Sequence, residues 1–257
     1  MSLKLKDHYG DNKLILSVDR LDYSKGILHR LKGFRRFLEL YPEYHGEVSL
    51  VMIIVPSRDQ VDSYSELKNK IDETIGGING EYSLLNWIPV HYFYHSFPFN
   101  ELVAMYHIAD MALVTPLRDG MNLVAKEYIA SKKRRNGVLI LSEMAGAIDE
   151  LPEAISINPN NTQSVANAID QALSMPAREQ KERLSAMRTR ISKVTVQNWG
   201  QEFMNDLSDA TEQGGTSRRQ LTTAQQQRVA TLFQTAKRRL IILDYDGTLR
   251  GFVKTPS

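Results

Sequence analysis

Short runs of apolar residues alternate along this chain with longer stretches in which apolar residues return every three or four positions. The short runs have the length of buried strands, and the longer stretches have the period of amphipathic helices. The predicted strands are Leu14–Val18, Val48–Val55, Val90–Tyr94, Met111–Thr115, Val138–Ser142 and Ala154–Ile157. The predicted helices are Ile27–Tyr41, Gln60–Ile75, Asn100–Ile108, Leu123–Lys133, Thr162–Ser174, Ala177–Thr195 and Val196–Leu207. Strands that alternate with helices predict an α/β fold, in which a parallel sheet is flanked by helices.

The segment Ser208–Thr223 interrupts this alternation. It is rich in Ser, Thr, Gly and Gln and contains the pair Gly214-Gly215. Such a composition is typical of an interdomain linker. We therefore predict one domain over residues 1–207, a linker over 208–223 and the start of a second domain over 224–257.

The composition narrows the range of functions. With 24% charged residues and a formal net charge of +2, the 257 residues have no strongly basic face to bind nucleic acid. The absence of cysteine excludes disulfides and thiolate metal sites and favours a cytoplasmic protein. The longest apolar run is far shorter than the ~18 residues of a membrane helix. The N-terminus has no signal-peptide core, so we expect a fragment that begins shortly before the first strand of a domain.

A polar turn follows the predicted strand Met111–Thr115. It carries Asp119 and Gly120, and Glu127 lies eight positions after Asp119. A helix that begins at such a turn presents free backbone N–H groups, which favour polar or anionic ligand groups. We expect both carboxylates near one side of the helix, spaced to hold two parts of a polyhydroxylated ligand. For an arbitrary sequence, a helix N-cap at Asp119 and a solvated Glu127 would be the better interpretation.

A second polar loop follows the predicted strand Leu14–Val18. It carries Arg20 and Lys25 and ends at Gly26. Two fixed cations at the carboxyl end of a parallel strand suit a diphosphate. Taken alone, they are more readily explained as solvated surface charges.

Together, SVDRLDYSKG (residues 17–26) and PLRDGMNLVAKEY (residues 116–128) resemble the donor-binding half of the trehalose-6-phosphate synthase family. These enzymes are retaining glycosyltransferases of the GT-B type, built from two Rossmann-like domains. The resemblance covers about Lys13–Leu207. It implies transfer of glucose from UDP-glucose to glucose-6-phosphate, which releases UDP and gives trehalose-6-phosphate. It places the acceptor site in an amino-terminal domain outside this chain, so the isolated chain is expected to be inactive; a homo-oligomer is compatible with it.

The resemblance gives catalytic roles to Arg20, Lys25 and Asp119. Arg20 and Lys25 contact the donor diphosphate in the family and stabilise the negative charge that grows on the leaving group. They act where other enzymes use a metal ion, so we expect no metal and no other cofactor for glucosyl transfer. Asp119 holds the hydroxyl groups of the donor glucose.

The resemblance extends to neighbouring donor contacts. The backbone amides of residues 120–122 face the glucose, the amides of Leu123 and Val124 reach the diphosphate, and Glu127 binds the ribose hydroxyls. The segment at Phe97 meets the uracil edge through the main chain. The donor-binding residues implied are Arg20, Lys25, Phe97, Asp119, Gly120, Met121, Asn122, Leu123, Val124 and Glu127.

The end of the chain carries another motif. After a predicted helix over Ala224–Lys237, a predicted strand, Arg239–Leu243, leads into Asp244 and Asp246 of DYDGT. This motif is similar to the first motif of haloacid-dehalogenase-like phosphatases, in which the first aspartate is the nucleophile and the second the general acid. The other motifs do not fit in the eleven residues after Asp246, so we expect Mg²⁺ only in a complete phosphatase domain. The alternatives to a synthase are a trehalose-6-phosphate phosphatase, as a fragment of a bifunctional synthase-phosphatase, and a non-catalytic nucleotide-sugar-binding module.

Overall fold

The computed structural model describes residue 10 and residues 12–57, 62–132, 136–193, 196–212 and 221–238. The chain divides into two compact units, Met1–Thr195 and Val196–Ser257, and each is described by itself. The strands of the first unit are β1 (Lys13–Arg20), β2 (Val48–Val55), β3 (Val90–Phe93), β4 (Met111–Val114), β5 (Val138–Ser142) and β6 (Ile155–Ile157). Its helices are η1 (Tyr23–Lys25), α2 (Ile27–Leu40), η2 (Pro42–Tyr44), α3 (Asp62–Tyr82), α4 (Phe99–Ile108), α5 (Leu123–Ser131), α6 (Ala147–Glu150), α7 (Thr162–Ser174) and α8 (Ala177–Lys193).

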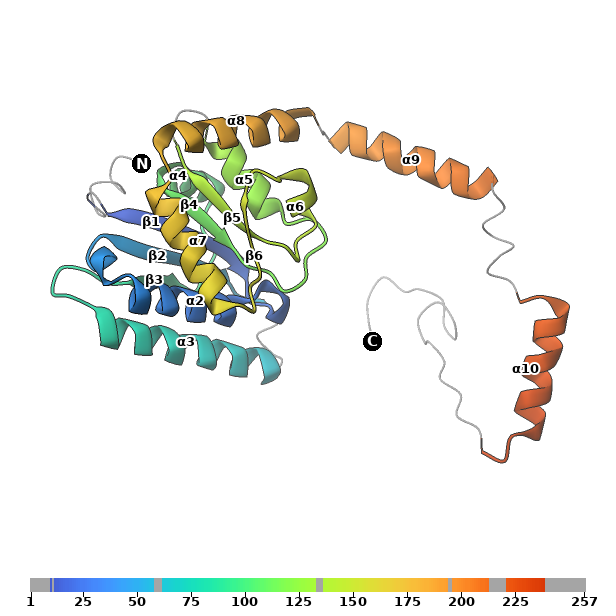
Figure 1. The fold of residues 1–257 in the computed structure, drawn as a ribbon. Helices are drawn as coiled ribbons and strands as arrows, with labels where there is room; N and C mark the ends of the chain where they lie inside the picture. The colour runs from blue at the N-terminus through green and yellow to red at the C-terminus, as the bar shows by residue number, and fades with distance from the viewer. Residues whose placement is uncertain are drawn as a thin grey trace. The chain divides into compact units, whose positions relative to one another are not determined.

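The six strands form one sheet in the order β3-β2-β1-β4-β5-β6 (Figure 1). Every neighbouring pair is parallel, so all carboxyl ends meet at one edge. The chain builds outward from β1 to β3, returns to place β4 beside β1, and then builds outward in the other direction. The topological switch point therefore lies between β1 and β4, where ligands of such sheets bind. This confirms the predicted α/β fold with a Rossmann-like parallel sheet.

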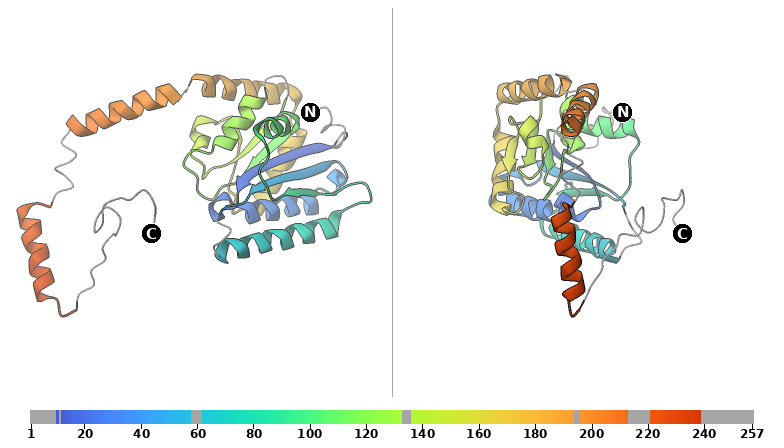
Figure 2. Two further views of the ribbon diagram at one scale, coloured as in Figure 1. Left: turned by 180° about the vertical axis from the view of Figure 1, so that it is seen from behind. Right: turned by 90° about the vertical axis from the view of Figure 1, so that its right-hand side faces the viewer.

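Helices cover both faces of the sheet (Figure 2). In β1, Ile15 packs with α2, α3 and α7 on one face, whereas Leu14 and Leu16 pack with α4, α5 and α8 on the other. The alternation follows from the two-residue period of a strand, and burial on both faces explains why the strands read as continuous apolar runs. Full burial of one such side chain contributes about 1.5–3 kcal/mol relative to exposure.

Helix α3 is longer than the sequence predicted. It continues to Tyr82, beyond the expected end at Ile75. Ile75 and Ile78 are both buried and extend the apolar stripe of Leu67 and Ile71 by one more turn. The helix therefore continues because tertiary burial outweighs the low helix propensity of the glycines in its last turns.

The second unit contains α9 (Val196–Glu212) and α10 (Thr223–Thr235). Helix α9 continues past Leu207, so residues 208–212 of the expected linker are helical; these residues include neither proline nor glycine. The unit boundary falls after Thr195, before the expected domain end at residue 207. Helix α10 begins at a capping box between Thr222 and Gln225. Asp244 and Asp246 lie outside the described residues.

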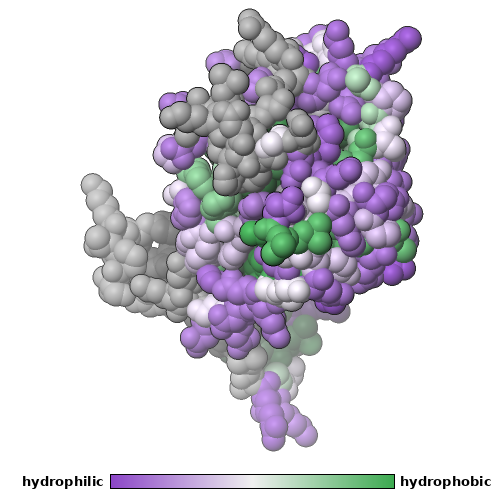
Figure 3. Space-filling model, turned by 90° about the vertical axis from the view of Figure 1, so that its left-hand side faces the viewer, coloured by the Kyte–Doolittle hydropathy of each residue, from purple (hydrophilic) through white to green (hydrophobic). Residues whose placement is uncertain are grey.

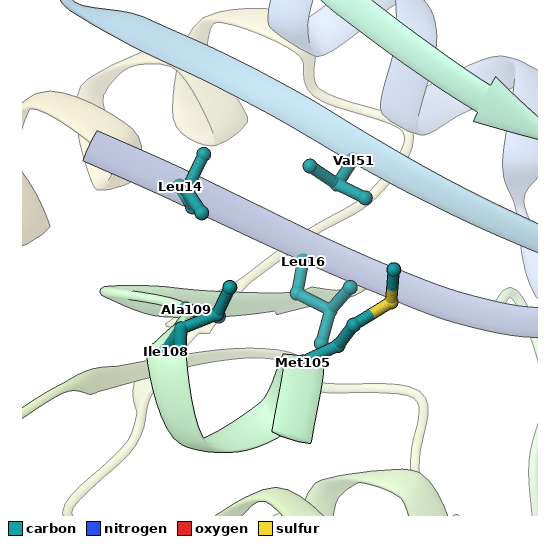
Figure 4. A pocket seen from close by; sticks show the side chains of 6 residues that line it. All are labelled: Leu14, Leu16, Val51, Met105, Ile108 and Ala109. Atoms are coloured by element: carbon teal, nitrogen blue, oxygen red, sulfur yellow. The ribbon is translucent and has the colours of Figure 1, made fainter. Parts of the chain in front are cut away.

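The first unit has a small cavity and an exposed turn that present apolar side chains. A cavity of about 10 Å³ between β1, β2 and α4 is lined only by apolar side chains (Figure 4): Leu14, Leu16, Val51, Met105, Ile108 and Ala109. The turn between α3 and β3 exposes Leu84, Leu85 and Ile88. Figure 3 shows a hydrophobic area surrounded by hydrophilic residues on one side of the molecule. No helix among the described residues has an apolar stretch long enough to cross a membrane.

Candidate functional site

The loop after β1 is held in a fixed turn. Asp22 caps the short helix η1, because its carboxylate accepts hydrogen bonds from the Ser24 amide and hydroxyl at 2.8 and 2.7 Å. Gly26 ends η1 with φ +63°. A Cβ atom at Gly26 would lie 2.1 Å from the carbonyl oxygen of Thr115, so only glycine fits here. The loop thus presses directly against the end of β4.

Asn122 fixes the end of the loop after β4. Asn122 adopts φ +72°, a left-handed conformation that asparagine tolerates better than most residues. Its side-chain oxygen accepts from the Ala125 amide at 3.0 Å and caps α5, while its amide nitrogen donates to Asp119 at 3.1 Å. The N-cap of α5 is therefore Asn122, and the interpretation of Asp119 as a helix cap is wrong. Because α5 begins at Leu123, Asp119 precedes the helix and does not share a helical face with Glu127.

The two loops meet across the switch point. The Leu117 amide donates to the Ser24 carbonyl at 2.7 Å. Lys25 Nζ lies 2.6 Å from Asp119 Oδ2, and these side chains are only 16% and 15% exposed. Partial burial favours the neutral acid, but the hydrogen bonds from Lys25 and Asn122 and the Lys25 charge outweigh it and hold the pKa of Asp119 below its usual range. Two residues predicted to contact different parts of a donor are thus paired with each other.

Arg20 differs from Lys25. It is the last residue of β1 and is exposed, and its side chain makes no ion pair or hydrogen bond with the described residues. Partial burial raises the pKa of Asp22, but the hydrogen bonds from Ser24 and the charges of Arg20 and Lys25 outweigh it and lower that pKa, so Arg20 does act on a carboxylate at this edge. An anion that approaches the edge would meet Lys25, which is paired with Asp119, and Arg20, which has no direct ion pair among the described residues.

The start of α5 adds backbone donors. The first helical amides, those of Leu123 and Val124, make no hydrogen bond within the part of the chain that the structure describes. This is the arrangement that favours anions at a helix N-terminus. Gly120 lies against Gly146, where an added Cβ would be 2.1 Å from the Gly120 carbonyl oxygen, and Met121 is exposed.

Glu127 and Phe97 lie apart from the ion pair. Glu127 is exposed on the second turn of α5 and accepts a hydrogen bond of 2.9 Å from the Tyr106 hydroxyl. Burial and the Glu127 charge raise the pKa of Tyr106, so the phenol stays a proton donor. Phe97 precedes α4 and packs against Phe93 and His95, with ring centroids 5.4 and 4.4 Å away. Among the described residues, no hydrogen bond or ring contact joins Phe97 to the other predicted donor contacts.

Sequence reasoning missed the polar network beneath these loops. Arg30 on α2 is fully buried and lies 2.6 Å from Asp19 of β1. Its Nε donates to the Thr115 hydroxyl at 3.0 Å, and the guanidinium also donates to Ser17. A signal was present: Ile27, Leu31 and Phe34 form the buried stripe of α2, and position 30 lies on that stripe. An arginine where the helical period calls for an apolar residue marks a buried charge that needs partners.

The described residues offer no cluster of metal ligands. Across the described ranges, no three His, Cys, Asp or Glu side chains are grouped so that they could hold a metal ion. Lys126 on α5 forms an ion pair with Glu150 at 2.7 Å.

Known proteins resemble this chain over its whole first unit. Residues 2–209 match the family model of glycosyltransferase family 20. A bifunctional trehalose-6-phosphate synthase/phosphatase from Thermoproteus tenax is 48% identical over 249 residues, which are 96% of this chain and 34% of that protein. A structure of the E. coli trehalose-6-phosphate protein bound with UDP-2-fluoro glucose is 40% identical with a TM-score of 0.77, over 80% of this chain and 46% of that one. A UDP-forming α,α-trehalose-phosphate synthase from Burkholderia xenovorans, in complex with glucose-6-phosphate, is 39% identical with a TM-score of 0.78, over the same shares.

Proposed function

The chain belongs to glycosyltransferase family 20, and from that membership we propose that it forms the donor-binding half of a UDP-forming trehalose-phosphate synthase. The reaction would transfer glucose from UDP-glucose to glucose-6-phosphate with retention of configuration. The chain spans 34% of the length of the Thermoproteus tenax relative and 46% of the two solved chains, so the activity of a whole enzyme is part of the proposal.

One observation carries the proposal: Lys25 and Asp119 meet at 2.6 Å across the switch point, where β1 ends in the exposed cation of Arg20. A diphosphate over this edge would contact Arg20, Lys25 and the first amides of α5. When the bond between glucose C1 and the phosphate oxygen breaks, the electron pair goes to the diphosphate, and both cations stabilise the added charge. Asp119 can accept hydrogen bonds from glucose hydroxyls and orient the sugar.

The acceptor completes the reaction in our proposal. Its hydroxyl approaches C1 on the face that the diphosphate leaves, forms the new C1–O bond and passes its proton to the departing phosphate oxygen. The configuration at C1 is then retained without a covalent enzyme intermediate. We assign the acceptor site to residues outside this chain, and the uracil and ribose to the segments at Phe97 and Glu127.

We propose further that donor binding changes the partners of Lys25. In the free protein its ammonium is shared with Asp119, so a bound diphosphate must share or displace that contact. UDP-glucose offers Asp119 sugar hydroxyls in exchange, whereas UDP offers none. The carboxylate should therefore favour the intact donor over the released nucleotide.

Metal-independent transfer in the cytoplasm remains part of the proposal. The metal-independent transfer is supported by Arg20 and Lys25, because two cations at this edge can neutralise a diphosphate as a metal ion does. The phosphatase alternative is supported by the bifunctional relative and by the motif at Asp244 and Asp246. A phosphatase would need residues beyond those of this motif, and the donor contacts retained in the first unit favour the synthase.

Calorimetric titration of the chain with UDP, UDP-glucose, GDP-glucose and glucose-6-phosphate tests the proposal. We expect UDP and UDP-glucose to bind in excess chelator, GDP-glucose to bind more weakly and glucose-6-phosphate not to bind. A tenfold gain in UDP affinity on adding Mg²⁺, about 1.4 kcal/mol, would contradict the metal-independent site. Absence of UDP and UDP-glucose binding would contradict the donor assignment itself.

A turnover assay tests the location of the acceptor site. The chain should form no trehalose-6-phosphate from UDP-glucose and glucose-6-phosphate, because loss of one cleft wall forfeits a proximity effect of about 7–11 kcal/mol. Measurable synthesis by this chain would show that the acceptor site lies within it.

A further inference from the structure

We propose that Arg30 is a positioning residue that sets the spacing of Lys25 and Asp119 across the switch point. The meaning of this spacing for ligands rests on the proposed donor site, but the spacing itself is a property of the protein. Arg30 is not accessible to a ligand at this edge of the sheet. It is 0% exposed and acts through the backbone and side chains that surround it.

Arg30 joins three elements that lead into the site. On β1 it binds Asp19 at 2.6 Å and donates to Ser17. At the end of η1 it donates to the Lys25 carbonyl at 3.4 Å. At the end of β4 it donates to the Thr115 hydroxyl at 3.0 Å. The strands on both sides of the switch point are therefore tied to one side chain.

Thr115 relays the contact to the glycine turn. Its hydroxyl accepts from Arg30 and donates to the Gly26 carbonyl at 3.3 Å. Gly26 is also the residue whose Cα lies so close to the Thr115 carbonyl that a Cβ would not fit. Arg30 thus holds the main chain of Lys25 through the Lys25 carbonyl, while the Lys25 ammonium contacts Asp119.

Only arginine suits this position. A planar guanidinium has five N–H donors in a rigid fork and can bond several acceptors in fixed directions. A lysine could keep the charge near Asp19 but has one nitrogen, so it could not hold Ser17, Lys25 and Thr115 as well. The proposed role of Arg30 therefore depends more on the fork of donors in its guanidinium than on its charge.

Two variants test the proposal: Arg30→Lys, which keeps the charge, and Thr115→Val, which keeps the shape and removes the hydroxyl that accepts from Arg30 and donates to the Gly26 carbonyl. Ser49→Ala is the matched control, because Ser49 is fully buried on β2 and its hydroxyl accepts from Trp87 at 3.0 Å and donates to the Ile88 carbonyl at 3.1 Å. Arg36→Lys controls for the replacement of a guanidinium by an ammonium on α2, since Arg36 is partly exposed and pairs with Glu39 at 2.9 Å. Thermal unfolding of all four variants gives the change in global stability.

Amide hydrogen exchange is the readout that does not depend on a ligand. In Thr115→Val and Arg30→Lys, exchange in residues 21–26 and 116–122 should rise about tenfold more than in α7, which holds no hydrogen-bond partner of Arg30. Ser49→Ala and Arg36→Lys should show no such local rise. Equal exchange of the two loops in Thr115→Val and Ser49→Ala would overturn the proposal, even if Arg30→Lys fails to fold.

UDP-glucose titration separates this proposal from the proposed function. If the wild-type chain binds UDP-glucose, Thr115→Val should weaken the affinity about three- to tenfold and Ser49→Ala should not. Unchanged affinity in a folded Thr115→Val variant would refute a positioning role. If the wild-type chain binds no donor, the proposed function fails, and the exchange result alone decides for or against Arg30.

Discussion

The loops at the switch point and the outer surface of α4 and α5 both carry predicted donor contacts, but they are built differently. Lys25 and Asp119 are mostly buried, paired with each other and fixed by Asn122 from one side and Arg30 from the other. Glu127 is exposed and has one hydrogen bond, from Tyr106. The difference teaches that the ion pair at the switch point is held by contacts from both sides, whereas the predicted ribose contact is held by one neighbouring side chain.

The largest effect should come from removing the buried Arg30 guanidinium next to the switch point. Arg30→Ala leaves Asp19 buried without its cation, which should lower the free energy of unfolding by about 3–5 kcal/mol. The matched Arg36→Ala removes an exposed pair from the same helix and should cost far less. Urea unfolding curves of both variants measure the difference. Equal losses would show that the buried pair is no more important than the surface pair.

The two cations should differ as ligand contacts. Arg20→Ala and Lys25→Ala should each weaken UDP and UDP-glucose by roughly 1.5–3 kcal/mol. Lys25→Ala should be the more damaging, because it also leaves the Asp119 carboxylate unneutralised beside the diphosphate. The double variant Lys25→Ala/Asp119→Ala should then regain part of the UDP affinity. A double variant that binds UDP no better than Lys25→Ala would show that Asp119 does not oppose the nucleotide.

Removal of the Asp119 charge should lower the affinity for UDP-glucose but not the affinity for UDP. In Asp119→Asn, UDP-glucose should bind more weakly, by about 1.5–3 kcal/mol, because sugar hydroxyls lose a charged acceptor. UDP should bind as well as to the wild type or somewhat better, since Lys25 is released. Calorimetry with both ligands measures the ratio. Equal weakening of both would contradict the assignment of Asp119 to the sugar.

Low pH should break the ion pair between Lys25 and Asp119 by protonating the Asp119 carboxylate. Because the pKa of Asp119 in the folded protein lies below its ordinary value of 3.8, the pair stabilises the protein fully above that value. The contribution is lost as the pH falls further, through the folded pKa. The difference in thermal midpoint between wild type and Asp119→Asn should therefore be present at about pH 7 and shrink toward about pH 3. A difference that stays constant over this range would mean that the carboxylate charge is not the source of the stabilisation.

The smallest effect should come from the open surface. Tyr106→Phe removes the hydrogen bond to the exposed Glu127 and should change UDP-glucose affinity by no more than about 1 kcal/mol. Tyr128→Phe is the control, because that phenol, also on α5, donates to the carbonyl of Asp110 between α4 and β4 and not to a predicted donor residue. If Tyr106→Phe weakened UDP-glucose as much as Asp119→Asn, the contrast between the two regions would not hold.

The sequence by itself predicted the parallel sheet and the two loops of the site. Uninterrupted apolar runs in the sequence predict buried strands such as β2 and β5, and the predicted ends of these two strands match the structure. The sequence predicted the two turns from Gly26 and Gly120. Gly26 has the positive φ that favours glycine, but in the second loop the left-handed residue is Asn122 and not Gly120. The roles of Phe97 and Glu127 in donor binding remain predictions.

What only the tertiary structure decided are the contacts between residues far apart in the chain. Lys25 and Asp119 are separated by 94 positions, and Arg30 and Thr115 by 85. No local pattern encodes that the end of β1 lies beside the end of β4, since this follows from the order in which the sheet is assembled. The same holds for α3, whose last turns are helical because Ile78 is buried against the core. Sequence periods report which face of an element is buried, whereas the partner that each polar group meets there depends on the packing of the whole domain.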